Sequence, residues 1–420
     1  MEGQISVYYR DWRNYPDVLI FQRMDVRFPN ANAELRERCE KRLKEKYGDS
    51  APEQFRSRLE SEFGIISKQG YSPYYLLAAK ISDRCAALGC HHNVRGTGGS
   101  SFVSYLAGIT DVNPLPPHKY CQRCKHVEFA DDVEYVSGFD LFTESSCVKT
   151  CTCCGGKLTG DGHNLDAVFF MADDGSLKPY YEFDVPNEQL HGMLEYLTMQ
   201  GEPKGTVTRE EAEATAEPLF HMEILGHRLF SVLGKLEELT GVPAGSVRLE
   251  EIDVPAFAEQ TPAPTYLSRE TFALLRTLRP KCFSDLVRAS GFAHGTGAWE
   301  ENAEELIGTV CKPEKTISHR DDLLQTLLRY GVERPTAVNL TRAVRKGRVK
   351  KALTPELAEL LKEKGVPEWY INSMRKIRYL FPRSHAVGFW IPILQVAWYQ
   401  THFPKTYAQA VRELYPAEAN

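Results

Sequence analysis

The spacing of apolar residues along the chain predicts mainly amphipathic helices. Apolar side chains that recur every three or four positions share one face of a helix, and this spacing occurs in residues 34–47, 55–66, 74–87, 187–199, 323–328 and 357–361. The longest apolar stretch, residues 386–397, contains Pro392 and is too short to span a bilayer, so we expect a buried helix. Residues 1–33 show no clear period, and we expect them to form an extended lead-in.

A glycine- and serine-rich segment, residues 92–102, interrupts this helical pattern. Three glycines within four positions let the backbone fold tightly and approach a ligand closely. Backbone N–H groups in such a turn can converge on one anion, and the serine hydroxyls and Arg95 would assist them. The alternative is an ordinary loop between two packed elements, and the glycine pattern alone does not decide between the two.

Composition and charge narrow the class of protein. With 420 residues, 42% of them hydrophobic and 25% charged, the chain is expected to form a globular protein of two or three domains. Because no charged-then-apolar leader opens the sequence, we expect a cytoplasmic protein with no membrane partner. The net charge of −5 does not by itself indicate a nucleic-acid-binding protein. Residues 340–385, however, contain twelve Lys or Arg and four Glu, a local +8 that can contact phosphates or simply face solvent.

Six of the eleven cysteines are concentrated in residues 121–154. They include two CxxC pairs, Cys121/Cys124 and Cys151/Cys154, with 26 residues between them. Each pair can offer two thiolates from one tight turn, and two such pairs complete a tetrahedral structural Zn²⁺ site. Disulfides or free thiols are the alternatives, but paired CxxC spacing in a cytoplasmic chain favours zinc. The two other cysteines of this group are alternative ligands, Cys147 and Cys153.

Two neighbouring segments, RGTGGSSFV at residues 95–103 and GITDVNPLPPH at residues 108–118, resemble the palm of the PolC-type DNA polymerase III alpha subunit. In that family the glycine/serine loop holds the triphosphate of the incoming nucleotide. The resemblance therefore implies nucleotide binding by Arg95, Gly96, Gly98, Gly99, Ser100 and Ser101. It recurs in blocks from about Glu34 almost to the C-terminus, and the family carries a four-cysteine zinc element where this chain has its CxxC pairs.

The same resemblance locates the carboxylates that would hold two Mg²⁺ ions in the palm. The family sequence Pro-Asp-Ile-Asp-Leu-Asn-Phe corresponds to residues 179–185, PYYEFDV, so Tyr180 and Glu182 occupy the two aspartate positions. Glu223 occupies the third carboxylate position. A tyrosine cannot replace a bridging carboxylate, and Mg²⁺ demands a tight octahedral geometry that the longer glutamates disturb. Asp184 would share a strand face with Glu182 and partly compensate.

The resemblance continues in shortened form toward the C-terminus. Only 42 residues separate Tyr180 from Glu223, far fewer than in the family, so we expect the thumb, which grips product DNA, to be missing between residues 186 and 220. From residue 230 onward the chain resembles the helical fingers of the family. This resemblance implies four candidates for DNA or phosphate contact, namely Arg345, Lys346, Arg383 and His385. We expect no counterpart of the family's phosphoesterase-like region, OB-fold, proofreading exonuclease or clamp-binding segment.

The resemblance thus implies an α+β protein, with a nucleotidyltransferase-type palm that carries a zinc-knuckle insertion and is followed by an all-α fingers domain. The expected divisions are the lead-in over 1–33, a reduced palm over 34–229 with the zinc insertion at about 118–165, and the fingers over 230–420. We expect a degenerate DNA polymerase core that keeps structural zinc and nucleotide or DNA binding. Nucleotidyl transfer would be lost or strongly weakened, because the Mg²⁺ ligands are altered.

Two alternatives stay open from the sequence. One is an active DNA polymerase or nucleotidyltransferase with a metal site rebuilt from Glu182, Asp184 and Glu223. The other is a zinc-stabilised interaction protein that binds another component of the replication machinery and needs no nucleotide.

Overall fold

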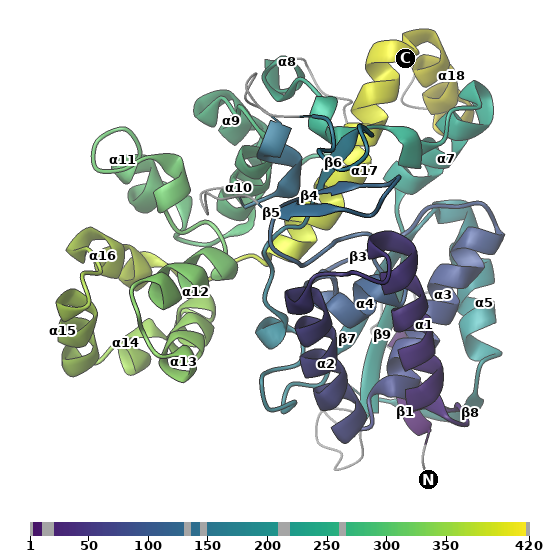
Figure 1. Cartoon of the computed structure of the whole chain (residues 1–420), viewed down its shortest axis with the longest axis horizontal. Helices are drawn as coiled ribbons and strands as arrows, with labels where there is room; N and C mark the ends of the chain where they lie inside the picture. Colours follow the sequence, from purple (N-terminus) through teal and green to yellow (C-terminus); the bar gives the residue numbers. More distant parts are fainter. Residues whose placement is uncertain are drawn as a thin grey trace. The chain divides into compact units, whose positions relative to one another are not determined.

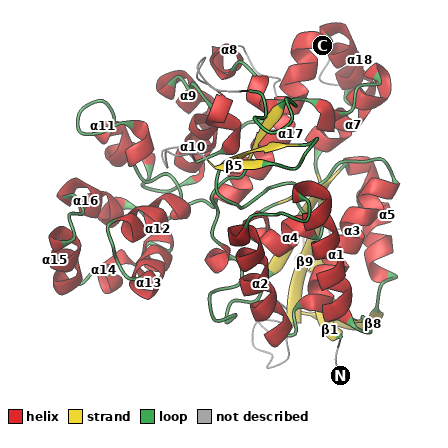
Figure 2. Cartoon of the chain, viewed as in Figure 1, coloured by secondary structure: helices red, strands yellow, loops and turns green. Residues whose placement is uncertain are grey.

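The computed structural model describes residues 3–10, 21–129, 136–142, 149–208, 219–259 and 266–416. The chain forms two compact units, Met1–Ile252 with Gly388–Asn420, and Asp253–Val387 (Figure 1). The first unit combines helices with strands, whereas the described residues of the second contain helices and no β-strand (Figure 2). The α+β class expected from the sequence is therefore confirmed.

A six-stranded mixed sheet is the centre of the first unit. Its spatial order is β3 (Asn93–Val94), β7 (Tyr180–Val185), β9 (Leu219–Gly226), β1 (Gln4–Arg10), β2 (Phe21–Arg27) and β8 (Glu202–Val207). Strands β7, β9 and β1 run parallel to one another, and the outer pairings are antiparallel. Because side chains alternate along a strand, β7 buries one apolar face and presents Tyr180, Glu182 and Asp184 on the other.

The expected lead-in over residues 1–33 is wrong. Strand β1 pairs with β9 on one side and with β2 on the other, so it is an inner strand of the sheet. Its Ile5, Val7 and Tyr9 share one face and are at most 8% exposed, and Tyr8 on the other face is buried as well. The strand covers only seven residues, and the sequence interpretation missed it.

The boundary expected at residue 230 is also displaced. Helix α7 (Arg228–Thr240) and the chain up to Ile252 belong to the first unit, and so do α17 (Arg383–His402) from Gly388 onward and α18 (Pro404–Leu414). Helix α17 confirms the buried helix expected over residues 386–397, and Pro392 lies inside it. Within the described part of the chain, no helix is both long and apolar enough to cross a membrane.

Helices cover the apolar face of the large sheet and share one hydrophobic core with it. They are α1 (Ala31–Tyr47), α2 (Glu53–Lys68), α3 (Ser72–Ala87), α4 (Phe102–Leu106) and α5 (Leu190–Thr198). The periodicity of α1 predicted its buried face correctly, since Leu35, Cys39 and Leu43 are all at most 3% exposed. Gly48 then ends α1 with a φ of 73°, a conformation that glycine adopts without strain.

The cysteine-rich segment forms a second, smaller sheet, visible as a separate group of strands in Figure 2. Its order is β5 (Val127–Phe129), β4 (His118–Cys121) and β6 (Leu158–Asp161), and all pairings are antiparallel.

An ion pair between a half-buried lysine and a buried aspartate fastens this small sheet to helix α1. The Nζ of Lys46 on α1 lies 2.5 Å from Oδ2 of Asp161 on β6. The same carboxylate oxygen accepts a hydrogen bond from Asn113 Nδ2 at 2.9 Å, and Oδ1 accepts from the N–H of Gly162 at 2.7 Å. Burial opposes both charges, but their mutual attraction outweighs it, so the pKa of Lys46 is raised and that of Asp161 is lowered.

The second unit is a bundle of mostly short helices. They are α8 (Val254–Glu259), α9 (Arg269–Leu278), α10 (Phe283–His294), α11 (Glu304–Leu306), α12 (Arg320–Arg329), α13 (Arg334–Arg345), α14 (Val349–Ala352), α15 (Pro355–Glu363), α16 (Glu368–Lys376) and the first residues of α17. Helix α12 begins with a capping box, in which His319 and Asp322 each bond the other's backbone N–H. The helical periodicity expected in residues 323–328 and 357–361 is confirmed by α12 and α15.

Replacing Lys46 with Met should destabilise the first unit by about 3 kcal/mol, because the buried Asp161 carboxylate loses its counter-charge. The loss should shrink below about pH 4, since a carboxyl with a lowered native pKa stabilises the fold fully above its unfolded pKa and progressively less as pH falls toward its native pKa. Urea unfolding of the parent and variant measures both effects. Lys41→Met on the same helix is the matched control, because Lys41 is 74% exposed and its pair with Glu45 is worth less than about 0.5 kcal/mol.

Candidate functional site

The glycine/serine loop forms a tight, buried turn between β3 and α4. Residues 98–100 make one 3₁₀ turn, and α4 begins immediately after Ser101. The Ser101 hydroxyl accepts a hydrogen bond from the N–H of Ser104 at 3.2 Å and so caps α4. Every residue from 96 to 101 is buried, whereas the Arg95 side chain is 36% exposed.

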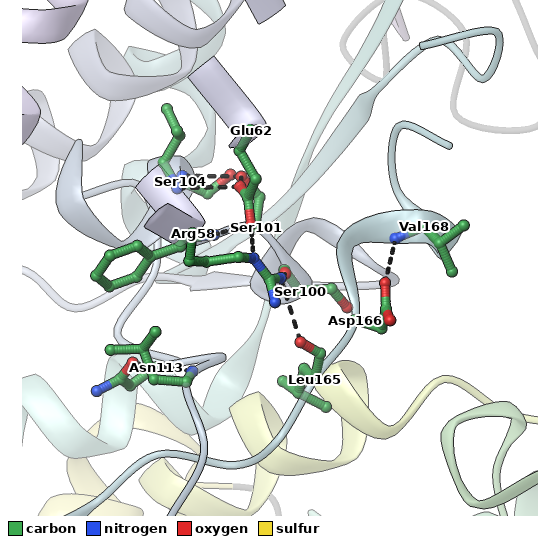
Figure 3. Close-up of polar contacts among 12 residues, drawn as sticks. Arg58, Glu62, Ser100, Ser101, Ser104, Asn113, Leu165, Asp166 and Val168 are labelled. Atoms are coloured by element: carbon green, nitrogen blue, oxygen red, sulfur yellow. Dashed lines mark hydrogen bonds and ion pairs between the residues drawn. The ribbon is translucent and has the colours of Figure 1, made fainter. Parts of the chain in front are cut away.

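A carboxylate from the protein itself occupies the N-terminal end of α4 (Figure 3). Glu62 on α2 accepts hydrogen bonds from the N–H of Phe102 at 3.1 Å and from the N–H of Val103 at 3.3 Å. It also accepts one from the Ser101 hydroxyl at 2.7 Å. Free N–H groups at a helix start attract anions, and here Glu62 supplies that anion internally.

Arg58 completes this internal anion site. Its Nε donates to Glu62, one turn further along α2. Its Nη2 donates to the carbonyl oxygen of Ser100 at 3.1 Å and to that of Leu165 at 3.2 Å (Figure 3). The guanidinium therefore neutralises the buried carboxylate and ties the loop to a distant segment of the chain.

The loop also lies directly over strand β7. Gly96 has a φ of +67°, and a Cβ built on it would lie 3.1 Å from the Tyr180 hydroxyl and 3.4 Å from Glu182 Oε2. The N–H of Arg95 donates to the Glu182 carbonyl at 2.8 Å. Any side chain at position 96 would thus press on the polar face of β7.

The three candidate catalytic carboxylates share that polar face. In the parallel register of β7 and β9, Glu182 lies opposite Glu223, and Asp184 follows on the same side of β7. The structure therefore brings together Glu182, Asp184 and Glu223, the three positions that the sequence analysis selected. It also surrounds them with cations, which the sequence interpretation did not anticipate.

Two of the three carboxylates have a basic side chain beside them. Arg95 Nε lies 3.7 Å from Asp184 Oδ2, and His221 Nε2 lies 3.0 Å from Glu223 Oε1. Burial raises the pKa of Glu223, but the His221 bond and the charge of Arg10 on β1 outweigh it and lower the pKa overall. Burial is the main cause that raises the pKa of Glu182, with repulsion from Glu223 added. Burial likewise raises the pKa of Asp184 to about 7, against the opposing effect of Arg95.

This arrangement is not preformed for a divalent metal. Among the described residues, the only group of three or more His, Cys, Asp or Glu side chains whose ligand atoms converge is the cysteine cluster. The carboxyl oxygens of Asp184 are buried without a hydrogen bond, and Asp184 is 1% exposed. A Mg²⁺ ion at Glu182 and Glu223 would require the side chains to rearrange toward octahedral geometry.

The cysteine cluster, in contrast, fits zinc. The Sγ atoms of Cys121, Cys124, Cys151 and Cys154 all lie within 4.8 Å of one another. Two Sγ···Sγ distances are 3.5 Å, between the first and fourth and between the second and third cysteine. Tetrahedral Zn²⁺ with Zn–S bonds of about 2.3 Å separates its sulfurs by about 3.8 Å. Cys153 is exposed and not in this cluster, and Cys147 lies outside the described residues.

The backbone of the two CxxC turns is the same. The N–H of Lys125 donates to the Cys121 carbonyl at 2.8 Å, and the N–H of Gly155 donates to the Cys151 carbonyl at 2.9 Å. Lys125 and Gly155 both adopt left-handed conformations, with φ of 65° and 69°. Donor type, spacing and turn geometry together match a structural zinc site.

The four candidate DNA contacts separate into two kinds. Lys346 is exposed and Arg345 half-buried, at the turn that follows α13. Arg383 is only 3% exposed, and its Nη2 donates to Asp322. His385 is half-buried, with its ring centroid 4.8 Å from that of Phe381. Because a guanidinium bound to a buried carboxylate serves the fold, Arg383 does not enter the proposed interface below.

The sequence interpretation missed the residues that organise the site. Glu62 had a usable signal, because it stands three residues after Leu59 and therefore on the apolar face of α2. A glutamate in such a position needs a partner in the folded protein. Arg10 and His221 had no such signal, since only the pairing of three strands brings them to the carboxylates.

Comparison with known proteins finds one matching family model and several similar sequences. Residues 33–200 match the family model for the bacterial DNA polymerase III alpha NTPase domain. The chain is a relative of the PolC-type DNA polymerase III. It is 28% identical to DNA polymerase III PolC-type of Bacillus subtilis, over 90% of this chain and 33% of that protein. Its identity to the Thermotoga maritima protein of the same name is also 28%, over 89% and 34% of the two chains. The chain thus spans about a third of the length of these relatives.

Purified protein should contain one zinc ion, and chelation should unfold the small sheet around β4. Replacing Cys151 with Ser should abolish stoichiometric zinc, because a structural site needs all four ligands. Cys153→Ser is the matched control two positions away and should retain full zinc content. Elemental analysis under reducing conditions measures both variants, and a parent protein without zinc would contradict the assignment.

Asp184→Asn should stabilise the protein at pH 8, by on the order of 2 kcal/mol more than at pH 5. The native pKa of about 7 lies above the unfolded value of about 4, so stability falls as pH rises between these values. Asparagine removes this loss because it does not ionise. Urea unfolding in EDTA at both pH values tests this, with exposed Asp49→Asn as the control. If Asp184→Asn destabilised the protein at pH 8, the ionised Asp184 carboxylate would instead be stabilised by Arg95.

Proposed function

We propose that this chain is a DNA-binding relative of the PolC-type polymerase core in which nucleotidyl transfer is lost or strongly weakened. The observation that carries the proposal is the polar face of β7 and β9. Tyr180 stands where the family has a metal-binding aspartate, and two longer glutamates replace the others. Arg95 lies beside Asp184 and His221 beside Glu223, so a metal ion would have to compete with these side chains.

The glycine/serine loop, which holds the triphosphate in the family, supports the same conclusion. Two N–H groups and one hydroxyl at the start of α4 already bind Glu62. A phosphate group would need to displace this buried carboxylate, which Arg58 holds in place. Arg95 is the half-exposed cation of the loop, and we retain it as the candidate contact for a nucleotide phosphate.

The basic turn between α13 and α14 supports DNA binding. Within the described part of the chain, no ion-pair partner is found for Arg345, Lys346, Arg348, Lys350 or Lys351. Gly347, with a φ of +65°, packs so closely that an added Cβ would lie 2.9 Å from the Arg378 carbonyl oxygen. This close approach brings Arg378 beside the turn. A group of uncompensated cations is suited to the phosphate backbone of DNA.

The strand register favours a second candidate function. Because Glu182 and Glu223 are direct neighbours on parallel strands, a small shift of Arg95 and His221 would leave two carboxylates facing one metal ion. An active polymerase with a rebuilt metal site is therefore the alternative that the catalytic assay must distinguish. The third possibility, a zinc-stabilised interaction protein, predicts binding of neither DNA nor nucleotide.

The protein should show no primer extension with Mg²⁺, and at most traces with Mn²⁺. The metal ligands are altered, and the expected absence of the thumb leaves nothing to position the primer terminus. A primer–template assay on protein purified away from host polymerases measures this. The double variant Glu182→Gln, Glu223→Gln is assayed in parallel to identify contaminating activity. Robust extension by the parent that is abolished in this variant would establish the rebuilt metal site.

The protein should bind DNA with an affinity that falls as salt rises, independently of base sequence. Replacing Arg345 and Lys346 together with Ala should weaken binding and reduce the slope of log affinity against log salt by about two. Fluorescence anisotropy over a salt series measures this slope. Lys362→Ala is the control, because Lys362 already pairs with Glu359 and Glu368. If the affinity for DNA changed neither with salt nor with the double substitution, the basic turn would not be the DNA contact.

A further inference from the structure

The second unit contains a cavity of about 280 Å³ that none of the features above uses. It lies between the end of α12 and the start of α16. Trp369, Tyr330 and Pro367 form its apolar wall, and the Trp369 side chain is half-buried. Trp369 packs edge-on against Tyr370, with ring centroids 5.5 Å apart. This contact holds the indole in one orientation, so that it can offer a flat surface to a ligand.

The floor of the cavity carries a buried polar group. Tyr370 is 2% exposed, and its hydroxyl interacts with the side chain of Thr326, which also lines the cavity. Burial raises the pKa of Tyr370, against the opposing effect of the bond with Thr326. A tyrosine hydroxyl donates one hydrogen bond and can accept others. An acceptor atom on a ligand could therefore take the proton of this hydroxyl.

Cations line the mouth of the cavity. Arg329 and Lys315 are both exposed, and the exposed Glu314 offsets one of their two charges. No ion pair of Arg329 is found in the described residues, so its guanidinium can bind an anion. The cavity therefore combines an aromatic wall, a buried donor and a cationic entrance.

We propose that this cavity binds one unpaired nucleotide of a single-stranded DNA. The base stacks on Trp369 and accepts a hydrogen bond from the Tyr370 hydroxyl, while its phosphate lies against Arg329. Stacking on aromatic side chains and neutralisation by nearby cations are the two contacts by which proteins hold single strands. The inference rests on the proposed function in one respect, because it takes DNA to be the partner of this unit.

Helix α16 connects the cavity to the basic turn. Trp369 lies at its N-terminal end, and Arg378 follows its C-terminal end at Lys376. Nine helical residues span about 14 Å. A single strand that leaves the cavity can therefore reach Arg378 and the cations beside Gly347. Cations near both ends of α16, together with the stacking surface of Trp369, favour a nucleic acid over an acidic peptide.

The test compares single-stranded and duplex oligonucleotides by fluorescence anisotropy, using the full 420-residue chain. Trp369→Leu and Arg329→Ala should each weaken single-strand binding by about tenfold, the effect of one lost stacking or phosphate contact. Duplex binding should not change, because paired bases cannot enter the cavity. Trp369→Phe should retain part of the affinity, since phenylalanine also stacks. Lys312→Ala, an exposed cation outside the cavity, is the control.

Free dAMP provides a second measurement that does not depend on the basic turn. It should quench tryptophan fluorescence saturably in the parent, and the quenching should disappear in Trp369→Phe. Unchanged melting temperature and zinc content would show that the variants are folded. Single-strand affinity that is unaffected in both Trp369→Leu and Arg329→Ala would overturn the proposal, and so would an equal loss for duplex DNA.

The outcomes also separate this inference from the proposed function. Salt-dependent DNA binding that needs Arg345 and Lys346 but not Trp369 would contradict the cavity assignment alone. Saturable dAMP binding at Trp369, without any affinity for DNA, would contradict the DNA-binding function and support the nucleotide pocket. If an acidic aromatic peptide saturated the cavity and neither dAMP nor a single strand did so, the site would belong to a protein partner and the inference would be wrong.

Discussion

The arrangement of the candidate site depends on one buried carboxylate. Glu62 binds two backbone N–H groups and the hydroxyl of Ser101, and Arg58 balances its charge. A buried ion without partners would be expensive, so this position of the loop is fixed by the need to satisfy Glu62. With the loop in this position, Gly96 lies over Tyr180 and Glu182, and its φ of +67° suits glycine. Glu62 on α2 thereby influences the surroundings of the candidate carboxylates.

The polar face of the sheet holds the three candidate carboxylates in surroundings that disfavour a divalent metal. Glu182, Asp184 and Glu223 lie on neighbouring strands, and Arg95, Arg10 and His221 lie beside them. Carboxylates that attract a divalent metal need excess negative charge and convergent oxygens. The positive charges of Arg95 and Arg10 reduce this excess, and burial favours the neutral form of Asp184. Both effects follow from packing, and both oppose metal binding.

Sequence alone determined much of the architecture. Helical periodicity gave the helices α1, α2, α12 and α15 and the buried faces of the first two, because an amphipathic stripe needs only local spacing. The CxxC pairs predicted the cysteine cluster, since each turn is built from consecutive residues. The relation to PolC-type DNA polymerase III was also evident from the motifs around Gly98 and is supported by the family match over residues 33–200.

Only the tertiary structure decided the rest. Strand β1 was missed because a seven-residue strand is defined by its partners β9 and β2, which lie nearly 200 residues apart in sequence. Arg383 was expected at a DNA surface, but Asp322 holds it in the interior of the second unit. The partners of Glu62, Asp184 and Glu223 likewise come from other elements. Local spacing specifies a helix or a metal-binding turn, whereas burial and charge compensation arise only when distant segments pack together.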